Sequence, residues 1–223
     1  MGTLYIVATP IGNLGDISMR AIETLKSVDV VLAEDTRVTK KLLDRYEIKK
    51  PVLRCDEYAK ESFFESVKER LIRGENIAFV SDAGTPGISD PGSKLVKFLR
   101  EQGTKISVVP IPGPSAITAI LSVSGISAGE FTFLGYAPHK KGREMFFKKT
   151  KEIKTRPILF YESPFRVRKA LESLSAVYGK EYKIIIGKEL TKIYEDIFNG
   201  TLESALEYFK GEKERGEFVM VIP

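Results

Sequence analysis

One long loop-forming segment carries the glycines and polar groups that a ligand site needs. The run Ser81–Gly92 follows the apolar stretch Asn76–Val80 and precedes a helical pattern over Ser93–Arg100. Its glycines let the main chain approach a ligand closely, and its carboxylates and hydroxyls can hold polar groups. Open α/β sheets bind ligands where a strand ends and a helix begins. We therefore expect a ligand here rather than an ordinary strand–helix connection, because long ordered loops are often functional.

Three further segments rich in glycine, proline or acidic residues also follow strand-like stretches. They are Thr9–Asn13, Ala33–Arg37 and Pro110–Ala116. Because the carboxyl ends of parallel strands share one edge of a sheet, we expect all four segments to line one crevice. None of them matches a Walker A or Gly-x-Gly-x-x-Gly pattern, and proline removes N–H groups that a phosphate cradle needs. A nucleoside triphosphate or a dinucleotide is therefore not favoured as the ligand.

The elements that must position these segments alternate along the first half of the chain. Short apolar runs, expected to be strands, are separated by amphipathic helical patterns, and this alternation predicts βαβ units with a parallel sheet. The expected strands are 4–8, 28–33, 51–55, 77–81 and 105–110, and the expected helices are 18–27, 36–46, 60–73, 93–102 and 114–124.

The second half is predicted to hold a mixed sheet. Strands are expected over 131–136, 156–161, 183–188, 193–200 and 218–222, with a helix over 164–177 that has Pro164 at its start. The strands 183–188 and 193–200 are joined by a short link, which predicts antiparallel neighbours. The fold class is therefore α/β with two domains: residues 1–112 form an N-terminal parallel-sheet domain and residues 113–223 a C-terminal mixed-sheet domain.

Two scarcities exclude several kinds of catalytic centre. The chain of 223 residues holds one cysteine, Cys55, and one histidine, His139. Zinc sites built from Cys and His, His-ligated haem pairs and Cys–His nucleophile couples all need more of these residues. An oxygen-ligated Mg²⁺ site stays open, since the chain has 30 acidic residues, but no spacing of carboxylates points to one and we expect no metal. No apolar run reaches the roughly 20 residues that span a bilayer, and the N-terminus lacks a basic signal region. We expect a cytoplasmic protein without a membrane partner.

A basic run in the second half predicts a surface that contacts phosphates. The net charge of +5 tolerates an anionic partner without requiring one. The run His139–Arg143 is strongly basic and is followed by further lysines up to Lys151. The candidate phosphate contacts are Lys140, Lys141, Arg143 and Arg166. From charge alone, a solvated helix face is the more common explanation of such a run. The pairs Phe63–Phe64 and Phe146–Phe147 are expected in the core rather than as stacking partners for bases.

Motifs along nearly the whole chain resemble those of a known family. The segments that carry the resemblance are Leu4–Asp16, Ala33–Arg37, Ser81–Gly92, Pro112–Ala116, Phe160–Arg166, Gly187–Lys192 and Gly216–Val219. In this order they resemble the tetrapyrrole-methylase superfamily. Within it they resemble the branch that methylates the ribose 2′-oxygen of a P-site cytidine in 16S ribosomal RNA of the small subunit.

The resemblance implies a cofactor, a substrate and an assembly. The cofactor is S-adenosylmethionine, held between two α/β domains, and the substrate is 16S ribosomal RNA or the small ribosomal subunit. A homodimer is also implied. The resemblance favours RNA binding over a solvated helix face for Lys140, Lys141, Arg143 and Arg166. By motif position, the residues implied to bind the cofactor are Pro10, Asp82, Thr85, Ile88, Ser115, Ala116, Tyr161 and Leu190.

Methyl transfer to a hydroxyl needs alignment of the reacting atoms and an acceptor for the proton. The carboxylates expected at strand ends are Glu34, Asp35, Asp82, Glu162 and Glu189. We expect Glu34, Asp35 and Arg37 to be catalytic, with Asp35 and Arg37 orienting the ribose or its phosphate. An ion pair that only holds the loop is the alternative for these two residues.

Two other functions stay open from the sequence. One is methylation of a tetrapyrrole or another small molecule, and the other is RNA binding without catalysis. The basic run and the segment Tyr161–Arg166, which belongs to the RNA-modifying branch, favour RNA methylation over a small-molecule substrate.

Overall fold

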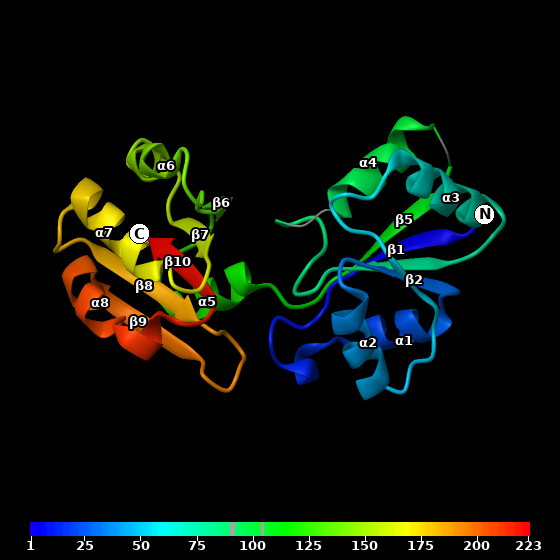
Figure 1. The fold of residues 1–223 in the computed structure, drawn as a ribbon, viewed down its shortest axis with the longest axis horizontal. Helices are drawn as coiled ribbons and strands as arrows, with labels where there is room; N and C mark the ends of the chain where they lie inside the picture. Colours follow the sequence, from blue (N-terminus) through cyan, green and yellow to red (C-terminus); the bar gives the residue numbers. More distant parts are fainter. Residues whose placement is uncertain (90–91, 104) are drawn as a thin grey trace. The chain divides into compact units, whose positions relative to one another are not determined.

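The chain folds into two units, each built on its own sheet (Figure 1). The computed structural model describes residues 1–89, 92–103 and 105–223. The first unit is Met1–Ser115 and the second is Ala116–Pro223.

The first unit contains a five-stranded, all-parallel sheet. The strand order is β3-β2-β4-β1-β5, with β4 and β1 in the interior. The strands are β1 (Thr3–Val7), β2 (Val30–Ala33), β3 (Val52–Arg54), β4 (Ile77–Val80) and β5 (Ser107–Ile111). The predicted parallel sheet is therefore confirmed.

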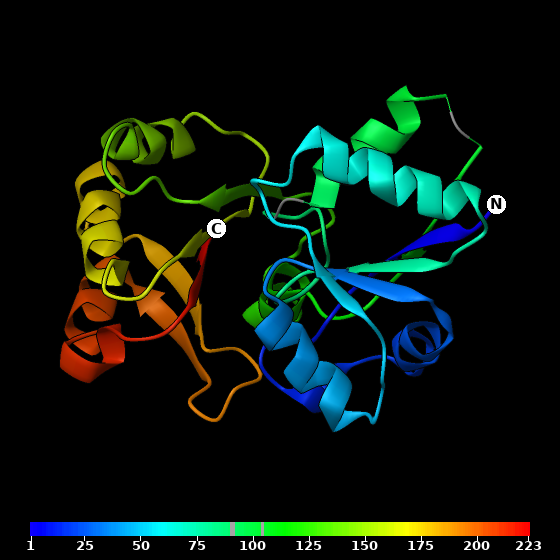
Figure 2. The ribbon, with the colours of Figure 1, turned by 45° about the vertical axis from the view of Figure 1, so that its right-hand side comes forward.

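Two pairs of helices cover the two faces of this sheet (Figures 1 and 2). The helices α1 (Met19–Ser27) and α2 (Thr36–Arg45) lie on one face, and α3 (Glu61–Ile72) and α4 (Gly92–Glu101) lie on the other. Successive residues of β4 face opposite sides, so Ala78 joins the α1–α2 core while Phe79 joins the α3–α4 core. Burial on both faces explains why the strand is continuously apolar. The short helix η1 (Leu14–Asp16) lies in the loop after β1.

The second unit contains a mixed sheet with the order β6-β7-β10-β8-β9. The strand β6 (Thr132–Tyr136) is parallel to β7 (Ile158–Glu162), whereas β10 (Phe218–Ile222) is antiparallel to both β7 and β8 (Lys183–Lys188). The strand β9 (Asp196–Thr201) is antiparallel to β8, as predicted.

Helices also lie on both faces of the second sheet (Figure 1). The helices α6 (Arg143–Thr150), α7 (Val167–Tyr178) and α8 (Leu202–Tyr208) contribute to a core that includes Phe147 and Phe160. The helix α5 (Ala116–Ser124) contacts β8 and β10. Gly187 of β8 lies close beneath α5, because a Cβ there would lie 2.9 Å from Ile120 Cδ1. The short helix η2 (Gly211–Glu214) precedes β10.

Two element boundaries in the second unit differ from the sequence prediction. The helix predicted from Pro164 begins at Val167, because Phe165 adopts φ +63°, which a right-handed helix cannot include. The strand predicted from Ile193 begins at Asp196. The chain before it turns through hydrogen bonds from Lys192 N to Glu189 O and from Glu195 N to Lys192 O. The predicted core aromatics are confirmed: Phe64 and Phe147 are buried, and Phe63 and Phe146 pack against their cores.

Adjacent residues of α3 offer a matched test of the core of the first unit. Leu71 is fully buried, whereas Ile72 is 46% exposed. We expect Leu71→Ala to lower the free energy of unfolding by about 2–5 kcal/mol, because it leaves a cavity. Ile72→Ala should change it by about 0.5 kcal/mol or less. Urea unfolding followed by circular dichroism measures both values, and equal losses would contradict the assigned facing of α3.

Candidate active site

The loops after β1 and β4 are joined by their main chains. Thr9 N donates to Gly84 O at 2.9 Å, and Gly84 N donates back to Thr9 O at 3.1 Å. The Thr9 hydroxyl also donates to Ser81 O at 3.1 Å. Gly84 has φ +81°, and a Cβ at this position would lie 3.4 Å from Ile11 Cγ2 and 3.7 Å from Pro114 O. Three loops that are distant in sequence therefore meet at Gly84.

The loop after β5 packs tightly against the end of β1. Ala8 N donates to Ile111 O at 3.1 Å, and the Ser18 hydroxyl contacts Pro112 O at 3.4 Å. A Cβ at Gly113 would lie 2.9 Å from Ala8 Cβ, closer than side chains normally approach. Glycine is therefore required here for packing against β1.

The loop after β2 joins the same edge of the sheet through a polar contact. Asp35 N donates to Asp82 Oδ1 at 3.0 Å, across 47 positions of sequence. All four segments that the sequence predicted to share one edge are thus linked by contacts. Of the run Ser81–Gly92, Asp90 and Pro91 lie outside the described residues.

Asp35 and Arg37 form a local ion pair at the start of α2. Asp35 is the N-cap residue, and its Oδ1 accepts from Arg37 N at 2.8 Å. The Arg37 guanidinium binds the same carboxylate, with Nη2 2.6 Å from Oδ2. Hydrogen bonding from this side chain holds the pKa of the Asp35 carboxyl far below its usual range. Such a carboxylate stays ionised at neutral pH and is a weak base, which suits orientation better than proton transfer.

The residues of the first unit that are implied to bind the cofactor lie on the joined loops. The Thr9–Gly84 bridge has an implied cofactor residue next to each partner in the sequence: Pro10, which follows Thr9, is buried, and Thr85, which follows Gly84, is half-buried. Asp82 and Ile88 are exposed, and Ser115 is half-buried after the loop that follows β5. Their roles stay predictions.

The residues of the second unit that are implied to bind the cofactor lie at the ends of β7 and β8. The Tyr161 ring packs 4.9 Å from the Phe133 ring and 5.1 Å from the Tyr136 ring, measured between centroids. Burial raises the pKa of Tyr161 to about 12, so its phenol is neutral at physiological pH. Leu190 is buried, and its Cδ2 would lie 3.0 Å from a Cβ at Gly187. Ala116, also implied, is half-buried at the start of α5.

A buried carboxylate at the end of β7 holds two of the arginines predicted to bind RNA. Glu162 is fully buried, and its Oε2 lies 2.6 Å from Arg143 Nη2 while its Oε1 lies 2.9 Å from Arg166 Nη2. Oε1 also accepts from Ser163 N at 2.8 Å. The two arginine side chains are only 13% and 17% exposed. Sequence reasoning missed this cluster, which we name the Glu162 clamp; the four-residue spacing from Glu162 to Arg166 was its only local sign.

The two neighbouring lysines differ from these arginines. Lys140 and Lys141 are exposed, and no carboxylate of the described residues forms an ion pair with either of them. Arg143 Nη1 donates to Pro138 O at 3.0 Å and so holds the turn that carries the lysines. The structure therefore leaves the lysines free for an outside partner and directs Arg143 inward.

Among the described residues, no group of three or more His, Cys, Asp or Glu side chains could hold a metal ion. No helix in the described ranges has the length and apolar character needed to cross a membrane.

The Glu162 clamp generates a stability prediction. Glu162→Gln removes the counter-charge of two partly buried guanidinium groups, and breaking such a buried pair costs about 3 kcal/mol or more. The control is Glu172→Gln, because Glu172 pairs with Arg168 on the exposed surface of α7. We expect a control effect of about 1 kcal/mol or less, measured by chemical denaturation. Comparable losses in the two variants would show that the clamp is not a stabilising feature.

Comparison with curated proteins shows close similarity along the whole chain. A protein of Synechocystis is 42% identical over 222 residues, covering 100% of this chain and 79% of its own length. A protein of Thermotoga maritima is 41% identical, covering 100% and 98% respectively. A protein of Bacillus subtilis is 43% identical, covering 100% and 75%. All three are named ribosomal RNA small subunit methyltransferase I.

Solved structures share the fold at much lower identity. A uroporphyrin-III-C-methyltransferase from Thermus thermophilus gives a TM-score of 0.68 at 15% identity, covering 100% of this chain and 94% of that one. A diphthine synthase gives 0.71 at 18% identity, covering 99% and 90%. The family model for tetrapyrrole (corrin/porphyrin) methylases matches residues 3–206. With its parallel sheet, its mixed sheet and its joined strand-end loops, this chain belongs to the tetrapyrrole methylase family.

Proposed function

We propose that this protein transfers a methyl group from S-adenosylmethionine to 16S ribosomal RNA of the small subunit, at the ribose 2′-oxygen of a P-site cytidine. The observation that carries the proposal is identity of 41–43% along the full chain to proteins named for methylation of small-subunit ribosomal RNA. Membership of a methylase family supports the choice of donor. A cytoplasmic location and a homodimer stay predictions.

The residues at the joined loops fit the chemistry of the donor. S-adenosylmethionine supplies a methyl group that its positively charged sulfur makes ready for transfer. The exposed Asp82 carboxylate suits the cationic groups of such a ligand, and Thr85 and Ser115 carry hydroxyls for its polar groups. Ile88 provides an exposed apolar surface for a ring. Gly84 is buried where the loops meet, and its lack of a side chain lets their main chains approach closely.

The chain must also position the ribose and accept its proton. Arg37 is exposed at its guanidinium, so together with Asp35 it can orient a hydroxyl or a phosphate of the substrate. The low pKa of Asp35 makes this carboxylate a poor proton acceptor. The adjacent carboxylate, Glu34, is half-buried at the end of β2 and takes the proton in this proposal.

The turn His139–Gly142 supplies the proposed RNA contact. Its lysines are exposed. Arg143, which is bound to Glu162, holds the turn through its hydrogen bond to Pro138 O. Exposed cations can neutralise phosphates. Because the backbone of this turn is already held, binding costs little further backbone freedom. Arg143 and Arg166 act in this proposal by holding the surface rather than by leading the phosphate contact.

The role of Asp35 can be tested by Asp35→Asn. Asparagine caps helices as well as aspartate does, so α2 should persist. We expect transfer of a labelled methyl group into small subunits lacking the modification to fall about a hundredfold, because the substrate is misaligned. Donor binding, measured by calorimetry, should be unchanged. The pH dependence of the wild-type rate should contain no step from Asp35 between pH 5 and pH 8, because the low pKa of this carboxyl keeps it charged throughout the range.

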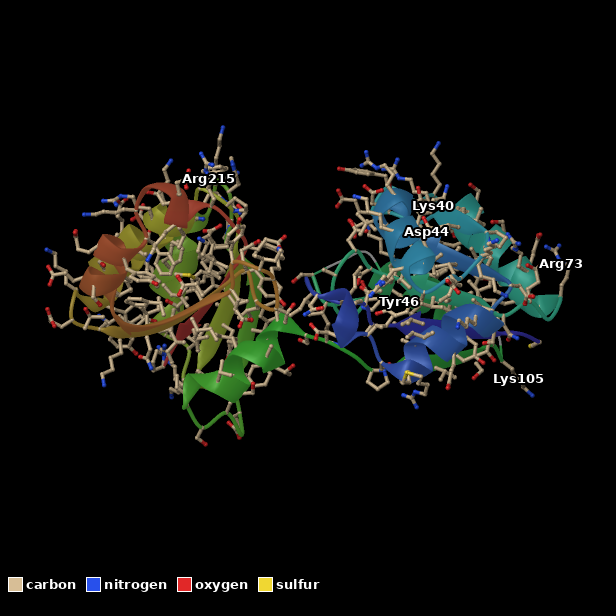
Figure 3. All side chains as sticks on the ribbon, turned by 90° about the horizontal axis from the view of Figure 1, so that it is seen from below. Lys40, Asp44, Tyr46, Arg73, Lys105 and Arg215 are labelled. Carbon is tan, nitrogen blue, oxygen red and sulfur yellow. The ribbon has the colours of Figure 1, made fainter. Side chains whose placement is uncertain are left out.

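The control for this test is Asp44→Asn. Asp44 is an exposed carboxylate of the same helix, one turn from the exposed Lys40 (Figure 3). Its substitution should leave transfer unchanged. Full activity of Asp35→Asn would reject the catalytic role of Asp35. Methylation of a porphyrinoid instead of RNA by the wild-type protein, or donor binding without transfer, would reject the proposed function.

The RNA contact is tested by neutralising Lys140 and Lys141 together as glutamines. A plot of log K for RNA binding against log salt concentration has a negative slope, and each lost phosphate contact should reduce the size of this slope by about 0.7–0.9. Loss of both lysine contacts should therefore reduce it by about 1.4–1.8. Filter binding to the small subunit at several salt concentrations measures this slope. Lys49→Gln with Lys50→Gln is the matched control, because it removes the same charge from an adjacent pair in the first unit. An unchanged slope in the Lys140–Lys141 variant would refute the assignment.

A further inference from the structure

Phe165 combines two unfavourable features at one position. Its side chain is 65% exposed, although large aromatic rings normally gain stability by burial. Its backbone has φ +63°, a conformation that bulky residues rarely adopt and that costs free energy. Glycine or asparagine would relieve the backbone strain, and a polar side chain would suit the exposure. Neither packing nor backbone geometry therefore explains a phenylalanine here.

The turn Ser163–Arg166 is held from several sides, so the strained conformation persists. Phe165 N donates to Glu214 O at 3.1 Å, and Arg166 N contacts Ser163 O at 3.3 Å. The Arg166 guanidinium is fixed by Glu162 at 2.9 Å, and α7 follows at once with the buried Val167. Strain that its surroundings impose in this way is typical of functional positions. The backbone of Phe165 is therefore held in place while its ring is exposed to solvent.

The turn that carries Phe165 is linked to the proposed phosphate-binding turn. Arg143 Nη2 contacts Arg166 O at 3.4 Å, while Arg143 Nη1 donates to Pro138 O at 3.0 Å. One side chain thus joins the turn that carries Phe165 to the turn that carries the exposed lysines. An exposed aromatic ring on a held turn, linked to a turn that carries exposed cations, matches the surfaces on which proteins stack single-stranded bases while holding the adjacent phosphates.

We propose that Phe165 stacks against an unpaired base of the RNA substrate and so contributes to substrate recognition. This inference rests on the proposed function, because it assigns a residue to the same RNA. The ring acts on binding and not on the reacting atoms. Since every base has a stacking face, it favours exposed, unpaired RNA without reading a particular base.

The test compares Phe165→Ala, Phe165→Tyr and Phe165→Gly with the wild type, using small subunits that lack the modification. We expect Phe165→Ala to raise KM for the subunit and its Kd about tenfold, with kcat at saturation and donor affinity unchanged. Phe165→Tyr keeps a stacking face and should retain wild-type KM. Tyr58→Ala removes an exposed ring from the first unit and should leave KM unchanged.

Phe165→Gly separates stacking from a structural role. Glycine relieves the positive φ, so this variant should melt at or above the wild-type temperature while binding the subunit as weakly as Phe165→Ala. Wild-type affinity in Phe165→Gly or in Phe165→Ala would overturn the inference. A change of oligomeric state in Phe165→Ala, measured by sedimentation, would also overturn it, by assigning the ring to a second copy of the chain. Failure of the wild type to methylate the subunit would reject the proposed function itself, which is a distinguishable outcome.

Discussion

The two-way main-chain bridge between Thr9 and Gly84 is the contact on which the candidate site depends. It joins the ends of two neighbouring strands, and the loops after β5 and β2 attach around it through Pro114 and Asp82. A main-chain bridge fixes position without using side-chain groups. The backbone therefore supplies the rigidity that alignment of reacting atoms requires, and side-chain contacts such as Thr9 Oγ1 to Ser81 O and Asp35 N to Asp82 Oδ1 reinforce the same edge of the sheet.

In the second unit, a buried carboxylate fixes the positions of two surface turns. Glu162 binds two guanidinium groups, so the cluster carries one more positive charge than negative. Burying ions is costly, and such clusters rarely add stability compared with apolar packing. What this cluster provides is placement, since Arg143 reaches both the lysine turn and the turn of Phe165. Its cost is consistent with a surface whose shape is set by the fold in advance, as the proposed RNA contact requires.

Much of the fold followed from local patterns. Alternating apolar runs and amphipathic helices predicted the parallel sheet, because each period is set by residues only a few positions apart. The meeting of the four strand-end loops followed from the same reasoning, since parallel strands end at one edge. The start of α7 was not predictable in this way. Pro164 is a favourable first residue of a helix, but Phe165 has φ +63°, outside helical geometry, in a turn that bonds to the distant Glu214 O.

The sequence by itself determined the class of each sheet, the scarcity of metal-binding residues and the family of the chain, because these follow from residue type, periodicity and motif order. Only the tertiary structure decided which charges are available. Arg143 and Lys141 are both cationic and lie two positions apart in the sequence. Arg143 is bound to a buried carboxylate 19 positions away, whereas Lys141 is exposed. Asp35 N likewise donates a hydrogen bond to Asp82, which lies 47 positions away in the sequence. Partnerships of this kind depend on the distance between side chains in space, which local sequence patterns do not specify.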